Sequence, residues 1–216
     1  MSQEKRRALL LVDLQNDFVK GGSLAVPDGF AVIDVANRIM PNFDLVVASQ
    51  DWHPPDHQSF ASRHRDLDIG QTFYLNGLQQ IAWPDHCIQG SCGAALVEKL
   101  NLSGIDRVIQ KGTDKGIDSY SAFYDNGHRR GTGLAEFLRD QRVGHVYVMG
   151  LATDYCVRFT ALDSIREGFR TSLILDGCRG VDLREGDIER AIKEMKSAGV
   201  EVTHSDETLK KENDRE

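Results

Sequence analysis

The sequence predicts an α/β protein with three layers, in which helices cover both faces of a six-stranded, mostly parallel sheet. Short apolar runs of the kind that buried parallel strands need alternate along the whole chain with segments of helical periodicity. Strands that alternate with helices pair in parallel, because each helix returns the chain to the same end of the sheet. The 216 residues and the ordinary apolar content of 40% suit one domain with a sizeable core.

The first half of the chain supplies two strands and one long loop. Residues 8–13 (ALLLVD) are an apolar run that ends at a carboxylate, and residues 44–50 (DLVVASQ) form the second such run. A loop rich in glycine and proline separates them and leads into a helix at about residues 30–39. Residues 51–91 have no clear periodicity, and a stretch of that length is a candidate for a functional loop.

The second half alternates regularly between the two element types. A helix at about residues 93–100 precedes a strand at 106–112, and a helix at 134–141 precedes a strand at 146–149. A further helix starts around Cys156. It is followed by a strand at 171–177, a strongly periodic helix at 184–198 and a last strand at 200–204.

Composition limits the classes of partner and compartment. A net charge of −7 argues against binding to nucleic acid or to an anionic membrane surface. The apolar run at residues 8–12 is too short for a signal peptide or a membrane span, and four irregularly spaced cysteines indicate reduced thiols in the cytoplasm. We expect a single domain over residues 1–216, with residues 1–7 and about 209–216 flexible.

Reactive residue types leave four of the predicted strands at the same edge. Asp13 ends the first strand, Asp51 and His53 follow the second, Lys111 ends the third, and the fourth leads to Cys156. In open parallel sheets, ligands bind beyond the carboxyl ends of the strands. These side chains are therefore expected to meet in one crevice.

Cys156 is the candidate nucleophile. If Asp154 caps the helix that follows, Cys156 lies in its first turn, where unpaired N–H groups and the helix dipole favour a thiolate. Asp13 would act as general base and acid, and the charge of Lys111 would lower the pKa of the thiol. The plainer alternatives are a buried apolar cysteine, a turn-capping aspartate and a surface lysine.

Asp51, His53 and one further histidine are candidate metal ligands. A carboxylate and two imidazoles with open positions suit Zn²⁺, Fe²⁺ or Mn²⁺, and spacing alone leaves the third ligand open between His57 and His86. Phe18 and Trp83 could wall a pocket for a flat ring, although aromatic residues are more often plain core.

Six segments, taken together, resemble one family over residues 8–204, nearly the whole chain. The segments are VDLQNDF, SQDWHPPDHQSFAS, WPDHCIQG, QKG, YSAF and GLATDYCV. They resemble the nicotinamidase/pyrazinamidase branch of the isochorismatase-like cysteine hydrolases. The resemblance implies an isochorismatase-like (Rossmann-like) fold.

The resemblance also implies a role for individual residues. It assigns a catalytic triad to Asp13, Lys111 and Cys156, and metal ligation to Asp51, His53 and His86. Some members have an additional histidine ligand, which lies two residues later than His57. His57 is therefore not assigned as a metal ligand here. A cis Leu151–Ala152 peptide would aim the N–H groups of Ala152 and Cys156 at an oxyanion. Phe18, Trp83 and Tyr120 would line the ring pocket.

The expected activity is hydrolysis of nicotinamide to nicotinate and ammonia through a cysteine thioester, in NAD salvage, with pyrazinamide as a second substrate. One divalent ion, Zn²⁺ or else Fe²⁺ or Mn²⁺, would be bound. Three alternatives remain: hydrolysis of another amide or of isochorismate, an idle binding member, and a metal-activated water with Cys156 merely structural. Partners are limited to the small-molecule substrate and further copies of the chain.

Overall fold

The computed structural model describes residues 5–209, and its centre is a six-stranded parallel sheet. The strand order is β5-β2-β1-β6-β7-β8, and every neighbouring pair is parallel. The strands are β1 (Arg6–Val12), β2 (Leu45–Asp51), β5 (Arg107–Lys111), β6 (Val143–Leu151), β7 (Arg170–Arg179) and β8 (Glu201–Thr203). The predicted parallel sheet is confirmed.

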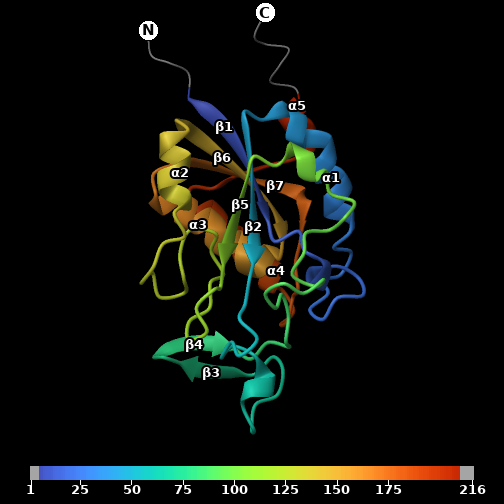
Figure 1. The fold of residues 1–216 in the computed structure, drawn as a ribbon. Coiled ribbons are helices and arrows are strands. Elements are labelled where there is room, and N and C mark those ends of the chain that lie inside the picture. The colour runs from blue at the N-terminus through green and yellow to red at the C-terminus, as the bar shows by residue number, and fades with distance from the viewer. Residues whose placement is uncertain (1–4, 210–216) are drawn as a thin grey trace, which may run out of the picture.

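Helices cover both faces of this sheet, so the predicted three-layer architecture is also confirmed. In Figure 1, α1 and α5 lie on one side of the sheet and α2 and α3 on the other, while α4 packs against α3. The helices are α1 (Ala31–Ile39), α2 (Leu134–Asp140), α3 (Arg158–Arg166), α4 (Asp187–Ser197) and α5 (Ser205–Leu209).

The two central strands form the middle of the core. Residues 8–12 of β1 and 146–149 of β6 are buried, as expected for strands that are covered on both faces. Gly150 (φ 129°) lets β6 approach β1 closely at its carboxyl end, because a Cβ at this position would collide with the carbonyl oxygen of Val12. This close approach fixes where the chain leaves the sheet before Cys156.

The predicted helix at residues 93–100 is wrong. Backbone groups of this segment bond to residues 14–17, and within the segment Leu100 N–H donates to the Val97 carbonyl at 2.9 Å, which closes a turn and not a helix. Asn16 N–H donates to the Ala95 carbonyl at 3.0 Å, and Val97 N–H donates to the Leu14 carbonyl at 2.9 Å. Long-range pairing has thus replaced the local hydrogen bonds that a helix needs.

The long loop contains a β-hairpin that we did not predict. β3 (Thr72–Leu75) and β4 (Leu78–Ile81) pair antiparallel around Asn76 and Gly77, both of which have positive φ. In Figure 1 the hairpin lies beyond the carboxyl ends of β2 and β5, separate from the main sheet. It therefore stands at the edge where the candidate site was predicted.

Regular structure extends close to both ends of the described chain. Arg6 and Arg7, which were predicted to be flexible, belong to β1, and Leu209 ends α5. Residues 1–4 and 210–216 of the predicted flexible ends lie outside the described residues. Between residues 5 and 209, no helix is both long and apolar enough to span a bilayer.

Candidate active site

Four adjacent strands deliver the predicted residues to one edge of the sheet. β5, β2, β1 and β6 are neighbours in that order, and Asp51 at the end of β2 pairs in register with Lys111 at the end of β5. Asp13 directly follows β1, and Cys156 follows β6. The sheet topology thus brings together side chains that lie up to 143 positions apart (156 − 13) in the sequence.

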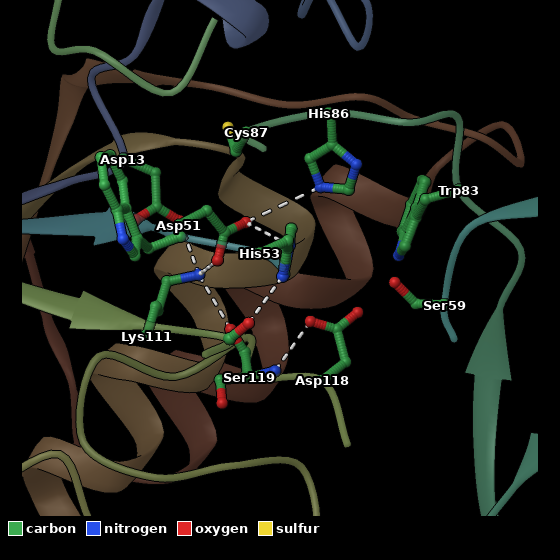
Figure 2. Close-up of polar contacts among 12 residues, drawn as sticks. Asp13, Asp51, His53, Ser59, Trp83, His86, Cys87, Lys111, Asp118 and Ser119 are labelled. Atoms are coloured by element: carbon green, nitrogen blue, oxygen red, sulfur yellow. Dashed lines mark hydrogen bonds and ion pairs between the residues drawn. The ribbon is translucent and has the colours of Figure 1, made fainter. Parts of the chain in front are cut away.

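Lys111 lies at the centre of this group and is only 1% exposed. Its Nζ is 2.6 Å from Asp51 Oδ1, 2.9 Å from Asp13 Oδ2 and 3.5 Å from Cys156 Sγ. It also donates to the Ser119 carbonyl at 2.8 Å, and Figure 2 shows the amine between the two carboxylates. Lys111 is therefore not a surface lysine.

Charge and burial set the proton affinity of these groups. Burial lowers the pKa of Lys111, but the Asp13 and Asp51 carboxylates outweigh that effect and hold it well above its usual value. Burial raises the pKa of Asp13, an effect that Lys111 opposes and Asp51 reinforces. Asp13 therefore takes up a proton more readily than an ordinary aspartate, and its Oδ1 accepts a 2.6 Å hydrogen bond from Ser49.

The turn that carries Cys156 differs from the predicted one. Thr153–Val157 form a π-helical turn, η5, and α3 begins only after it, at Arg158. Asp154 does not cap the turn. Its carboxylate instead accepts hydrogen bonds from the N–H groups of Val181 and Asp182, at 3.0 and 2.8 Å. The π-turn thus adjoins the loop after β7, and the expected helix cap is wrong.

The resting protonation state of Cys156 also differs from the expectation. Burial raises the pKa of this thiol well above its usual value, and the Asp13 and Asp51 carboxylates raise it further. Lys111 lowers the pKa, as predicted, but does not outweigh those effects. Cys156 is therefore a thiol at rest, and it needs a base when it reacts.

Asp51, His53 and His86 form a buried group whose ligand atoms all lie within 4.8 Å of one another. The Nε2 atoms of His53 and His86 are 3.5 and 3.8 Å from Asp51 Oδ2, and Figure 2 shows both rings directed at this carboxylate. Each Nδ1 pairs with a backbone carbonyl, that of Gly112 at 2.9 Å for His53 and that of Pro84 at 2.8 Å for His86. This pairing leaves both Nε2 lone pairs free for a cation.

The donor set fits a divalent metal. His53 Nε2 is a buried atom without a hydrogen-bond partner. Burial would raise the pKa of Asp51, but Lys111 and His53 hold it well below its usual value, so the carboxylate is ionised as a ligand must be. Gly112 makes room for His53, because a Cβ on this glycine would collide with the imidazole ring.

His57 lies beside this group without joining Asp51. Its ring centroid is 4.3 Å from that of His53, and its Nδ1 is 2.7 Å from Ser59 Oγ. Its nearest potential ligand group is His53 with Asp118. Of the two histidines left open by spacing, the structure places His86 and not His57 against Asp51.

A small cavity adjoins both Cys156 and the Asp51 group. Its wall includes all three predicted ring-pocket residues, Phe18, Trp83 and Tyr120. The cavity also contacts Ala152, and the Leu151–Ala152 peptide is cis, as the resemblance implies.

Sequence reasoning missed several residues of this site. Asp118 and Tyr155 also line the cavity, and Gln15 pairs through its side-chain amide with both backbone groups of Asp51 at 2.8 Å. Gln15 lies within the segment VDLQNDF, so the sequence held a signal for it. Asp118 and Tyr155 only flank the residues that were singled out.

Comparisons with known proteins agree with this geometry. Residues 7–207 match the Isochorismatase domain family. The nicotinamidase of Escherichia coli (strain K12) is 51% identical over 199 residues, which cover 89% of this chain and 92% of that protein.

Two solved structures are similar over nearly their whole length. An Acinetobacter baumanii nicotinamidase/pyrazinamidase has a TM-score of 0.91 at 42% identity, covering 95% of this chain and 99% of that one. The pyrazinamidase of Pyrococcus horikoshii, solved in complex with zinc, has a TM-score of 0.75 at 38% identity. The match covers 92% of this chain and 99% of that one. The family match over nearly all of the chain, together with these relatives, shows that the protein belongs to the isochorismatase family and, within it, to the nicotinamidase/pyrazinamidase branch.

Proposed function

We propose that this protein is an amidohydrolase that converts nicotinamide and water to nicotinate and ammonia, with Cys156 as the nucleophile. One observation carries the assignment: the Lys111 amine contacts Asp13, Asp51 and Cys156 at once, and Asp51 and Cys156 line the same cavity. A buried lysine between two carboxylates and a thiol has no purely structural advantage, because each buried charge costs desolvation energy.

The first half of the reaction transfers the acyl group to sulfur. Asp13, whose pKa burial raises, takes the proton of the Cys156 thiol as the sulfur attacks the amide carbon. The N–H groups of Ala152 and Cys156 are assigned to the oxyanion that develops on the amide oxygen. Asp13 then gives its proton to the departing nitrogen, the C–N bond breaks, and ammonia leaves a thioester on Cys156.

The second half returns the enzyme to its starting state. Asp13 removes a proton from a water molecule that attacks the thioester carbon, the C–S bond breaks, and the acid that forms loses its remaining proton to solvent and leaves as nicotinate. The proton on Asp13 passes back to the sulfur. Lys111, whose Nζ is 2.9 Å from Asp13 Oδ2, would keep the Asp13 carboxyl group in place through both halves.

Asp51, His53 and His86 are assigned as ligands of one divalent ion, with zinc as the proposed metal. When bound, the ion would supply positive charge and an open position for the pyridine nitrogen. The zinc complex of the Pyrococcus pyrazinamidase and the carboxylate–imidazole donor set support this choice. Phe18, Trp83 and Tyr120 would hold the ring by its faces and edges.

The same site would accept pyrazinamide, whose ring is also a flat nitrogen heterocycle. We assign the activity to NAD salvage in the cytoplasm and to a single domain over residues 1–216. The cytoplasmic assignment is supported by four free cysteines, since oxidising compartments favour disulfides.

Ammonia release from nicotinamide tests the proposal. The wild-type protein is expected to release one ammonia for each nicotinate, and Cys156→Ala, which cannot form a thioester, is expected to fold and release none. Cys178→Ala is the matched control, because Cys178 is also buried and free but does not line the cavity. Appreciable activity in Cys156→Ala would favour a metal-activated water over the thioester route.

A further inference from the structure

The β3–β4 hairpin places one polar side chain behind the cavity wall, in contact with residues that line the cavity. Gln80 of β4 is 3% exposed, although it belongs to a hairpin that lies outside the main sheet. Its Nε2 is 2.9 Å from Asp118 Oδ2, 2.9 Å from the Ile81 carbonyl and 3.0 Å from the Tyr120 hydroxyl. A buried polar side chain with this many partners has a defined orientation.

The chemistry of the partners fixes which way the Gln80 amide faces. The Asp118 carboxylate and the Ile81 carbonyl only accept hydrogen bonds, so the NH₂ end must face them. The Oε1 end accepts from Asn126 Nδ2 at 3.4 Å. Asn126 in turn accepts from the Tyr120 backbone N–H at 2.9 Å, so Gln80 and Asn126 hold Tyr120 at both its hydroxyl and its backbone.

The hydrogen bonds of Gln80 connect it to residues that line the substrate cavity. The Tyr120 hydroxyl accepts from Gln80 and also from Trp83 Nε1, at 3.0 Å each, and both aromatic residues lie on the cavity wall. The Asp118 carboxylate bridges Gln80 and the backbone N–H of Ser119, whose carbonyl accepts from Lys111. Figure 2 shows Asp118 and Ser119 adjoining Lys111 and His53.

We infer that Gln80 is a positioning residue for the amide substrate: from the hairpin, it sets the place of the Tyr120 ring and the Asp118 carboxylate on the cavity wall. This inference rests on the proposed function. Gln80 acts on substrate binding more than on the chemical step, because Lys111 keeps its contacts to Asp13, Asp51 and Ser119 without it. Its loss should therefore raise KM more than it lowers kcat.

Gln80→Met tests the inference, because methionine keeps the length of the side chain and removes every hydrogen bond. We expect KM for nicotinamide to rise about tenfold, the effect of roughly one lost hydrogen bond, with kcat within about twofold of wild type. Alkylation of Cys156 by iodoacetamide should keep its wild-type rate. Gln79→Met is the matched control, since Gln79 precedes Gln80 on β4 and its side chain is exposed.

Two further variants keep the test decisive. Gln80→Glu preserves the shape of the side chain and places a second carboxylate against Asp118, so it should raise KM further, and it carries the test if Gln80→Met does not fold. Tyr120→Phe removes the hydroxyl that Gln80 contacts, so the double variant with Gln80→Met should have a KM close to that of the worse single variant.

The outcomes separate this inference from the proposed function. A wild-type protein that releases no ammonia from nicotinamide would contradict the function. If the wild type is active, KM values for both Gln80 variants equal to that of Gln79→Met would overturn the positioning role alone. The positioning role would also be overturned if the fold-increases in KM from Gln80→Met and Tyr120→Phe multiplied in the double variant.

Discussion

At the scale of single residues, the charge of Lys111 connects two carboxylates to the thiol of Cys156. Lys111 Nζ lies 3.5 Å from the sulfur, and its charge lowers the pKa of the thiol against the opposing effects of burial, Asp13 and Asp51. Removing the charge leaves only the groups that raise the pKa. The thiol should then ionise at a higher pH than in the wild type.

Lys111→Met is expected to move the pH profile of Cys156 alkylation to higher pH. The rate of modification by iodoacetamide, followed at each cysteine by mass spectrometry over a pH series, measures the shift. Cys92 is the internal control, because it is exposed and its profile should be the same in both proteins. An unchanged profile at Cys156 would mean that Lys111 does not act on the thiol.

At the scale of elements, the turn before α3 depends on the loop that follows β7. Asp154 is 3% exposed, and its carboxylate accepts from the N–H groups of both Val181 and Asp182. Such charge-assisted bonds stabilise more than neutral ones, and their loss leaves two partly buried N–H groups without this acceptor. Asp154 therefore fixes the turn of Cys156 against a segment that comes 27 residues later.

Asp154→Ala should lower the free energy of unfolding by roughly 2–4 kcal/mol, because two partly buried hydrogen bonds to a carboxylate are lost. Asp154→Asn keeps one acceptor oxygen and should lose about half as much. Urea denaturation followed by circular dichroism measures both values. Equal stability of the alanine variant and the wild type would show that water replaces the carboxylate at this loop.

The sequence predicted the strands and most helices, and it failed where distant segments decide the backbone pairing. All six strands of the main sheet were predicted, because apolar runs such as residues 8–12 have to be buried wherever they lie. The helix at 93–100 was wrong, since its backbone pairs with residues 14–17, and no local pattern encodes that contact. The hairpin could have been predicted, because Asn76-Gly77 is a strong turn signal that we overlooked.

In the candidate site, the residues at strand ends were predictable from the sequence, and those that depend on the folding of the long loop were not. Asp13, Asp51 and Lys111 end parallel strands, so topology alone brings them together. Gln80 and Asp118 could not be predicted, because their role depends on how a loop folds back over the cavity. The thiol state of Cys156 was mispredicted, because the balance of burial and three charges depends on distances that the sequence does not contain.

At the scale of the whole molecule, the proposed metal site joins the sheet to the long loop. Asp51 ends β2, while His53 and His86 come from the loop region that also carries the β3–β4 hairpin. The cavity contacts both this group and Cys156. A metal in this place can either hold the substrate ring for the thiol or merely stabilise the loop.

The two roles predict different substrate preferences. If the metal anchors the pyridine nitrogen, benzamide should be turned over at least about a hundredfold less well than nicotinamide, because positioning is worth roughly several kcal/mol and ~1.4 kcal/mol is tenfold. Picolinamide should also be poor, since its nitrogen stands in a different place relative to the amide. Steady-state ammonia release with the three amides measures the preference.

Histidine variants and metal analysis complete this prediction. His53→Ala and His86→Ala should each lower the metal content, and the loss of activity should fall hardest on nicotinamide. His204→Ala is the control, because that side chain is 58% exposed and lies outside the group. A merely structural metal would give comparable turnover of benzamide and nicotinamide in the wild type, and unfolding once the metal is removed. That pair of results would overturn the anchoring role, because the pyridine nitrogen would then contribute nothing to catalysis.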